Sequence, residues 1–334
     1  MIAAPPSDDL NALVRQLSAT GAWGDVRSLL ASRVGEARTQ PELATAWAEA
    51  HLRTGNPRDA HGWLSETLAA IERSGDRAQV RRALNLLGVA STELGALEEA
   101  EATFDRAAQL GRTDGDELLV ARATNNLAAI AHVRGRRDVA VALYALALPA
   151  YQRLGSARGL AESYHNLAIT LREQAELDRA DECERRAIEY ARDAGTPALA
   201  AMARVGRAEV YLRRDDLLMA EATAHVAARE LAAAGDPIRE ADALRVAGVA
   251  CTRRGDIVAA RSALDRAVSL ARTHGHVLIE AECLRARAEA AAAAGDGAVA
   301  RDDLRAAAEL FSRLGAAEEE AEARQRLEAI ADAT

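Results

Sequence analysis

The chain has 334 residues, 49% of them hydrophobic but only 3% aromatic, so its core must be built mainly from Ala, Leu and Val. A formal net charge of -9 argues against a general nucleic-acid binder, because such affinity depends on neutralising many phosphates. Three cysteines without a C-x-x-C pair indicate neither a disulfide framework nor a zinc site, and the longest apolar stretch, residues 139–150, is too short to span a bilayer.

The N-terminal segment has no signal-peptide pattern and begins a shorter repeat. MIAAPPSDDL lacks a basic region followed by an apolar one, so we expect a cytoplasmic protein with a disordered segment at residues 1–6. Gly21 and Val26 precede Gly55 and Ala60 by 34 residues, which predicts one short repeat over residues 7–40. All basic residues are arginine, and a GC-rich bacterial genome would explain this bias.

From residue 41 onward the sequence repeats every 40 residues. Between the turn positions, apolar residues recur at spacings of three and four, which is helical periodicity. Residues 41–320 are therefore predicted to form seven helical hairpins, each with two helices of roughly 17 residues. The turn positions form two series 20 residues apart: Gly55, Gly95, Gly135, Ala175, Asp215, Gly255 and Gly295, and Gly75, Gly115, Gly155, Gly195, Gly235, Gly275 and Gly315.

Small residues recur where paired helices should touch, as at Gly88, Ala128 and Gly248. They allow two helices to approach closely. The fifth and sixth copies depart most from the pattern, because Glu184 replaces a bulky residue and arginines stand at expected apolar positions. The acidic segment 317–334 is predicted to be a C-terminal capping helix and tail.

The repeated pattern resembles the tetratricopeptide repeat family, most clearly in ELGALEEAEATFDRA (residues 93–107) and RRGDIVAARSALDRA (residues 253–267). The long period is similar to that of kinesin light chains, Rap-type bacterial regulators and adaptors with Leu-Gly-Asn repeats. This resemblance implies an all-α, right-handed superhelical solenoid of antiparallel helix pairs, with about eight repeats and a C-terminal capping helix.

The same resemblance implies that the first helix of each pair lines a concave groove that contacts ligands. A ladder of asparagine amides there can pair with successive peptide groups of an extended chain. The alternative is that these side chains are solvated or bonded within the protein. The polar residues that the resemblance places at groove positions in the N-terminal half are Asn85, Asn125, Asn126, His165 and Asn166.

Arginines accumulate beside these positions and suit an acidic tail, because a guanidinium binds carboxylates or phosphates bidentately. Acidic residues such as Glu209, Asp242 and Glu282 map to the same surface, so internal salt bridges are the alternative. The arginines predicted for the groove are Arg82, Arg122, Arg172, Arg213, Arg245, Arg253 and Arg285.

The sequence shows no grouping of nucleophile, base and orienting residue, and no phosphate-binding loop after a strand. We therefore expect a non-enzymatic scaffold that needs no cofactor or metal and binds a protein or peptide partner, with no nucleic-acid or membrane partner. One alternative is a peptide-sensing regulator that acts on a separate output protein. RNA binding by a helical repeat is a second alternative, and the Ala-rich C-terminal unit also allows a homodimer.

Overall fold

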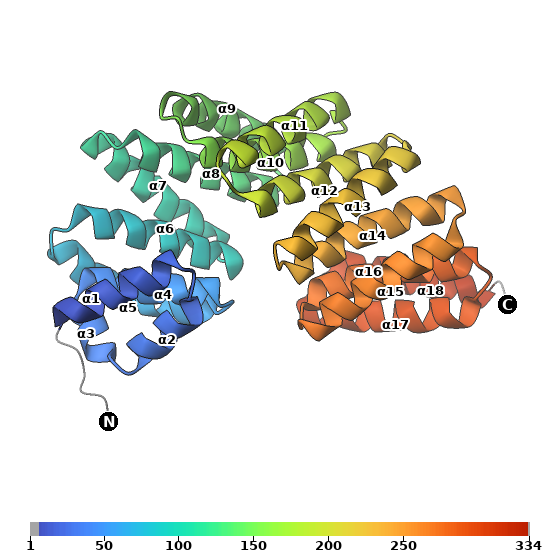
Figure 1. Ribbon diagram of the computed structural model, residues 1–334, viewed down its shortest axis with the longest axis horizontal. Coiled ribbons are helices and arrows are strands. Elements are labelled where there is room, and N and C mark those ends of the chain that lie inside the picture. The colour runs from blue at the N-terminus through green and yellow to red at the C-terminus, as the bar shows by residue number, and fades with distance from the viewer. Residues whose placement is uncertain (1–6, 333–334) are drawn as a thin grey trace. The chain divides into compact units, whose positions relative to one another are not determined.

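The computed structural model describes residues 7–332, in which 18 α-helices and no strand are present (Figure 1). From α4 to α9 and from α10 to α18, each helix packs chiefly on its neighbours in the chain. The predicted all-α architecture of paired helices is therefore confirmed. Two compact units are distinguished, residues 1–155 and residues 156–334.

Unit 1 contains nine helices in its described part, the last six of which form three hairpins. In these hairpins α4, α6 and α8 are the first helices, and α6 contacts both α4 and α8. The helices are α1 (Ser7–Ala19), α2 (Trp23–Ala31), α3 (Val34–Thr39), α4 (Pro41–Arg53), α5 (Pro57–Arg73), α6 (Arg77–Glu93), α7 (Leu97–Asp114), α8 (Glu117–Val133) and α9 (Arg137–Arg153).

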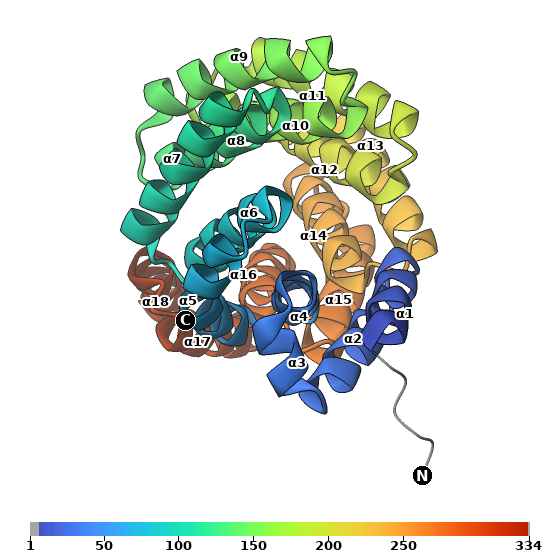
Figure 2. The same cartoon turned by 90° about the vertical axis from the view of Figure 1, so that its left-hand side faces the viewer.

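Unit 2 contains four hairpins and a final helix. Its first helices contact one another in the order α10, α12, α14, α16, and the second helices α11 and α13 lie on the outer side of α10 and α12 (Figure 2). The helices are α10 (Ala157–Glu173), α11 (Leu177–Asp193), α12 (Pro197–Arg213), α13 (Leu217–Ala233), α14 (Pro237–Arg254), α15 (Ile257–Thr273), α16 (Val277–Ala293), α17 (Gly297–Leu314) and α18 (Ala317–Asp332).

The predicted turn positions adopt the left-handed conformation that ends each helix. Gly135 has a φ of 71°, and the two residues that replace glycine in this series follow it: Ala175 has a φ of 60° and Asp215 a φ of 62°. The 40-residue period therefore records a backbone requirement, since L-residues adopt this conformation at an energetic cost.

Replacing Ala175 by glycine is expected to raise the free energy of unfolding by about 1 kcal/mol, because it relieves the left-handed strain at an exposed position. Urea denaturation measures the change. Ala194→Gly is the matched control: its φ of -79° suits alanine, so glycine there should destabilise by roughly 0.5–1 kcal/mol. Equal effects at both positions would contradict this interpretation.

Small residues bring paired helices into close contact, as predicted. A Cβ atom added to Gly88 on α6 would lie 2.6 Å from the ring of Phe104 on α7, and one added to Gly248 would overlap Leu264 on α15. Ala128 is fully buried at the same place in the next pair. The close approach of these helices limits the size of residues at this seam.

The N-terminal part differs from a simple hairpin, because residues 7–40 form three helices instead of two. Helix α2 ends at Ala31, and Arg33, with a φ of -131°, leaves the helical conformation before α3 begins. The Ser32 hydroxyl donates to the Leu29 carbonyl at 2.8 Å, a local bond that competes with helix continuation. Residues 1–6, predicted to be disordered, lie outside the described residues.

The final helix, α18, covers the last hairpin of unit 2. Ala323 is fully buried, and Leu327 and Ile330 pack against a core cluster that includes Leu304 and Phe311 of α17. Its first turn carries three glutamates, which suit a helix N-terminus. Across residues 7–332, no helix is long and apolar enough to cross a membrane.

Candidate functional site

Two predicted asparagines meet on neighbouring first helices of unit 1. The Asn126 Nδ2 on α8 donates to the Asn85 Oδ1 on α6 at 3.4 Å, and both side chains are half-buried. Each amide carries two donors and an acceptor with two lone pairs, so this single long bond leaves most of their capacity unused. The pair can therefore bind further polar groups.

Asn125 lies in the core instead of on the exposed face expected from the sequence. Only 6% of it is exposed, and it takes part in an interaction within the protein. The reason is geometric, because adjacent helical residues point about 100° apart, so Asn125 and Asn126 cannot both face outward. Of the two, Asn126 is the available side chain.

Two arginines flank the asparagine pair but differ in their partners. Arg82 precedes Asn85 by three residues on α6, and its guanidinium lies 2.7 Å from a carboxylate oxygen of Glu49 on α4. Arg122 precedes Asn126 by four residues on α8, which places both on one side of that helix. Arg122 is exposed, and no ion pair holds it within residues 7–332.

In unit 2, His165 turns inward to a buried carboxylate. Its Nδ1 lies 3.0 Å from Oε2 of Glu184 on α11, and the Glu184 side chain is fully buried. Glu184 occupies the repeat position of Phe104, and a Cβ atom added to Gly206 on α12 would overlap its carboxylate. His165 is thus part of a buried pair, whereas the amide of the adjacent, half-buried Asn166 has no hydrogen-bond partner among the described residues.

Burial and charge act on this pair in opposite directions. Burial lowers the pKa of His165, but the Glu184 carboxylate outweighs it and raises that pKa above its ordinary value. Burial also raises the pKa of Glu184, against the opposing effect of His165. Both shifts lead the folded protein to retain protons, while the Glu184 Oε1 has no hydrogen-bond partner among the described residues.

The first helices of unit 2 carry a continuous set of ion pairs. Arg172 on α10 lies 2.6 Å from Glu209 on α12, which in turn lies 3.2 Å from Arg245 on α14. Arg245 also lies 2.6 Å from Asp242 and 3.6 Å from Glu282 on α16. Burial lowers the pKa of Arg245, but these three carboxylates together raise it. These five residues form the ion-pair surface of unit 2. On it the arginines are paired with acidic residues of the protein itself, which is the alternative that the sequence left open.

The remaining predicted arginines also differ in whether they have a partner within the protein. Arg285 on α16 lies 2.6 Å from Glu322 on α18. Arg253 at the end of α14 donates to the Leu212 carbonyl at 2.9 Å and to the Asp215 carboxylate at 2.7 Å, so it supports a turn. Arg213 is exposed, with no ion pair among the described residues.

Positional mapping along the repeats missed a second polar cluster, on the opposite side of α12. Arg204 and Arg207 turn away from the ion-pair surface toward α11 and α13, and they line a cleft with Arg185. The signal in the sequence was the presence of arginine where the repeat pattern calls for apolar residues.

Comparison with known proteins identifies the repeat type. Residues 119–193, which run from α8 to α11, match the tetratricopeptide repeat family model. Within this segment the repeats are tetratricopeptide repeats. No curated protein sequence shows significant similarity to the chain.

Solved tetratricopeptide-like structures share the fold at low sequence identity. A Rap protein complexed with Competence and Sporulation Factor aligns at 15% identity over 98% of each chain, with a TM-score of 0.63. The apo quorum sensor NprR from B. thuringiensis aligns at 13% identity over 97% of this chain and 98% of its own, with a TM-score of 0.57. A STAND protein with a tetratricopeptide repeat sensor from Pyrococcus horikoshii has a TM-score of 0.65 at 14% identity, over 93% of this chain and 51% of its own. These similarities show the fold alone.

Proposed function

We propose that the chain is a non-enzymatic scaffold that binds an extended peptide segment of a partner protein on the first helices of unit 1. The observation that carries this proposal is the half-buried amide pair of Asn85 and Asn126 on adjacent helices. Amide side chains pair with peptide N–H and C=O groups without selecting particular side chains. Asparagine is also a poor residue for a helix interior, so its presence at both positions fits a binding role.

The surroundings of the asparagine pair favour a peptide with an acidic side chain. Arg122 is exposed and unpaired among the described residues, on the same side of α8 as Asn126. A guanidinium in this state can bind a carboxylate without first losing another partner. In unit 2, by contrast, Arg172 and Arg245 are already engaged by acidic residues, although Asn166 on α10 also offers an amide without a partner among the described residues.

Replacing both Asn85 and Asn126 by alanine is expected to weaken peptide binding by about 2 kcal/mol, roughly 30-fold in Kd, at about 1 kcal/mol for each lost hydrogen bond. A peptide selected from a random display library on the purified chain serves as the ligand for calorimetric titration. Gln152→Ala is the matched control, because it removes an exposed amide from the second helix α9. Unchanged affinity in the double variant, with folding intact by circular dichroism, would refute the anchor assignment.

A peptide-sensing regulator that acts on a separate protein is the second candidate function. It is favoured by the fold shared with a Rap protein complexed with Competence and Sporulation Factor. X-ray scattering with and without the selected peptide separates the two candidates. A sensor should change its scattering profile when the peptide binds, whereas a rigid scaffold should keep it.

We infer a reducing, cytoplasmic location from the three buried free thiols of Cys183, Cys251 and Cys283.

A further inference from the structure

A cleft of about 320 Å³ opens between α11, α12 and α13, on the side of α12 opposite the ion-pair surface. It is called the arginine cleft here, after Arg185, Arg192, Arg204 and Arg207, which line it together with Ile188 and Val226. Glu189 is the one acidic residue among its lining side chains. Its size is at the lower end of the range for ligand pockets, which suits a small ligand.

The cleft exists because the repeat pattern fails at two positions of α12. Arg204 stands where other copies have Leu84, Leu244 and Leu284. All three leucines are buried in the core. Arg207 likewise replaces a leucine of the earlier copies. Two long polar side chains of α12 thus line the cleft at positions that leucine occupies in other copies.

Neighbouring carboxylates hold the guanidinium groups in place without occupying all their donors. The Nε of Arg207 donates to Asp181 at 2.6 Å, and Arg204 forms an ion pair with Glu230 through one terminal nitrogen. The side chains of Arg204 and Arg207 are only 13% and 30% exposed. A guanidinium has five N–H donors, so nitrogens remain for a ligand in a partly desolvated setting, where charge interactions are strong.

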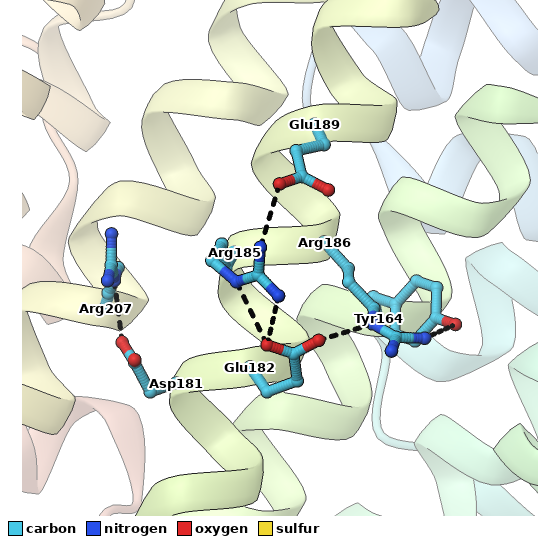
Figure 3. Close-up of polar contacts among 7 residues, drawn as sticks. All are labelled: Tyr164, Asp181, Glu182, Arg185, Arg186, Glu189 and Arg207. Atoms are coloured by element: carbon cyan, nitrogen blue, oxygen red, sulfur yellow. Dashed lines mark hydrogen bonds and ion pairs between the residues drawn. The ribbon is translucent and has the colours of Figure 1, made fainter.

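The rim of the arginine cleft has one guanidinium group held by carboxylates and one without an ion pair. Arg185 on α11 lies between Glu182 and Glu189, which fix its position (Figure 3). Arg192, about two helical turns after Arg185 on α11, is exposed and forms no ion pair with any described residue. Fixed guanidinium groups beside a free one form a site that is preorganised for an oxyanion.

A second cleft in unit 2 is lined by equal numbers of basic and acidic residues. The space between α15, α16 and α17, of about 220 Å³, is lined by Arg261 and Arg287 but also by Asp265 and Asp296. Arg287 is clamped by Asp303 at 2.8 Å and by Asp265 at 2.9 Å. Its lining charges cancel. The lining of the arginine cleft has four guanidinium groups and one carboxylate, and with the carboxylates of Asp181, Glu182 and Glu230 behind the lining, Arg192 is left as the guanidinium without an ion pair among the described residues.

We propose that the arginine cleft is a second binding site, which accepts a small organic oxyanion: a carboxylate or phosphate monoester on an apolar body. The guanidinium groups of Arg192, Arg204 and Arg207 bind the charged group. Ile188 and Val226 contact the apolar part. The site is separate from the asparagine pair and does not depend on peptide binding there.

The test is calorimetric titration of the full chain with phenyl phosphate and phenylacetate, and with uncharged benzyl alcohol as the control ligand. At low salt, at least one of the two anions is expected to bind with a Kd of about 1 mM or tighter. Arg204→Leu/Arg207→Leu should weaken this binding by about tenfold or more, because it removes two charge-assisted contacts. The leucines match other copies of the repeat, so the variant is expected to fold.

Two further variants test a single guanidinium group of the cleft and provide a control outside it. Arg192→Ala removes an exposed, unpaired guanidinium and should weaken anion binding about threefold or more without a change in melting temperature. Arg287→Leu, in the charge-balanced cleft, should bind like the wild type. Comparison of the two anions identifies the preferred head group. The proposal would be overturned if neither anion bound, or if benzyl alcohol bound as tightly as the anions. It would also be overturned if Arg204→Leu/Arg207→Leu and Arg192→Ala kept the affinity of the wild type.

Discussion

Replacement of His165 by leucine is expected to lower the free energy of unfolding at pH 7 by about 3 kcal/mol. Glu184 is fully buried, and His165 is the ion-pair partner 3.0 Å away. Without the imidazole, Glu184 must remain charged in the core or take up a proton. Protonation of a carboxyl group with an ordinary pKa of 4.5 costs about 3.4 kcal/mol at pH 7, at about 1.36 kcal/mol for each pH unit.

The double variant His165→Leu/Glu184→Leu is the control for this prediction. Leu264 and Leu304 occupy the position of Glu184 in later copies, so the apolar pair should recover most of the lost stability. Urea denaturation of the wild type, both single variants and the double variant completes a mutant cycle. A single variant as stable as the wild type, or a double variant no better than His165→Leu, would contradict this role of the pair.

The pair also gives stability a defined pH dependence. The pKa values of His165 and Glu184 are both raised in the folded protein, so the folded state binds more protons than the unfolded state. Stability from His165 is therefore fully present below pH 6.5, the ordinary value, and falls as the pH rises through the folded pKa. In the His165→Leu variant, acidification from pH 7 toward pH 5 should recover stability, because Glu184 becomes protonated.

Replacement of Arg245 by leucine is expected to cost about 2–3 kcal/mol at pH 7. The change leaves Asp242, Glu209 and Glu282 without their shared cation, and the Arg245 side chain is only 19% exposed. Burial already raises the pKa of Glu282, so acidification should restore part of the loss as this group takes up a proton. Urea denaturation at pH 7 and pH 5 measures both effects.

Arg213→Leu provides the matched comparison for Arg245→Leu. Arg213 is exposed near the end of α12 and forms no ion pair among the described residues, so its loss should change stability by no more than about 0.5 kcal/mol. Equal costs for the two variants would show that the ion pairs on the first helices of unit 2 do not stabilise it.

The helical hairpins could be predicted from the sequence because the turns impose a local requirement. A left-handed residue follows each helix from α4 to α17, and this requirement identified Ala175 and Asp215 as turn residues despite the missing glycines. The interruption at Arg33 was not predictable from spacing, since it depends on local competition for backbone hydrogen bonds. Repeat periodicity thus located helices well wherever the period was regular.

The candidate site was predictable only in part. Repeat position placed Asn85 and Asn126 on neighbouring first helices, where the structure brings their amides together. Position alone did not separate Asn126 from the buried Asn125, because one residue along a helix changes its direction by about 100°. The contact of His165 with Glu184 depends on side-chain direction across two helices, which a one-dimensional repeat does not specify.

Photo-crosslinking of the library-selected peptide, with a diazirine side chain, to the full chain tests the proposed scaffold function most directly. Mass spectrometry locates the attachment points. Peptide capture by the asparagine pair predicts crosslinks on the first helices α4, α6 and α8, which are lost in Asn85→Ala/Asn126→Ala and kept in Gln152→Ala. Crosslinks confined to the second helices α5, α7 and α9, or unchanged in the double variant, would contradict it.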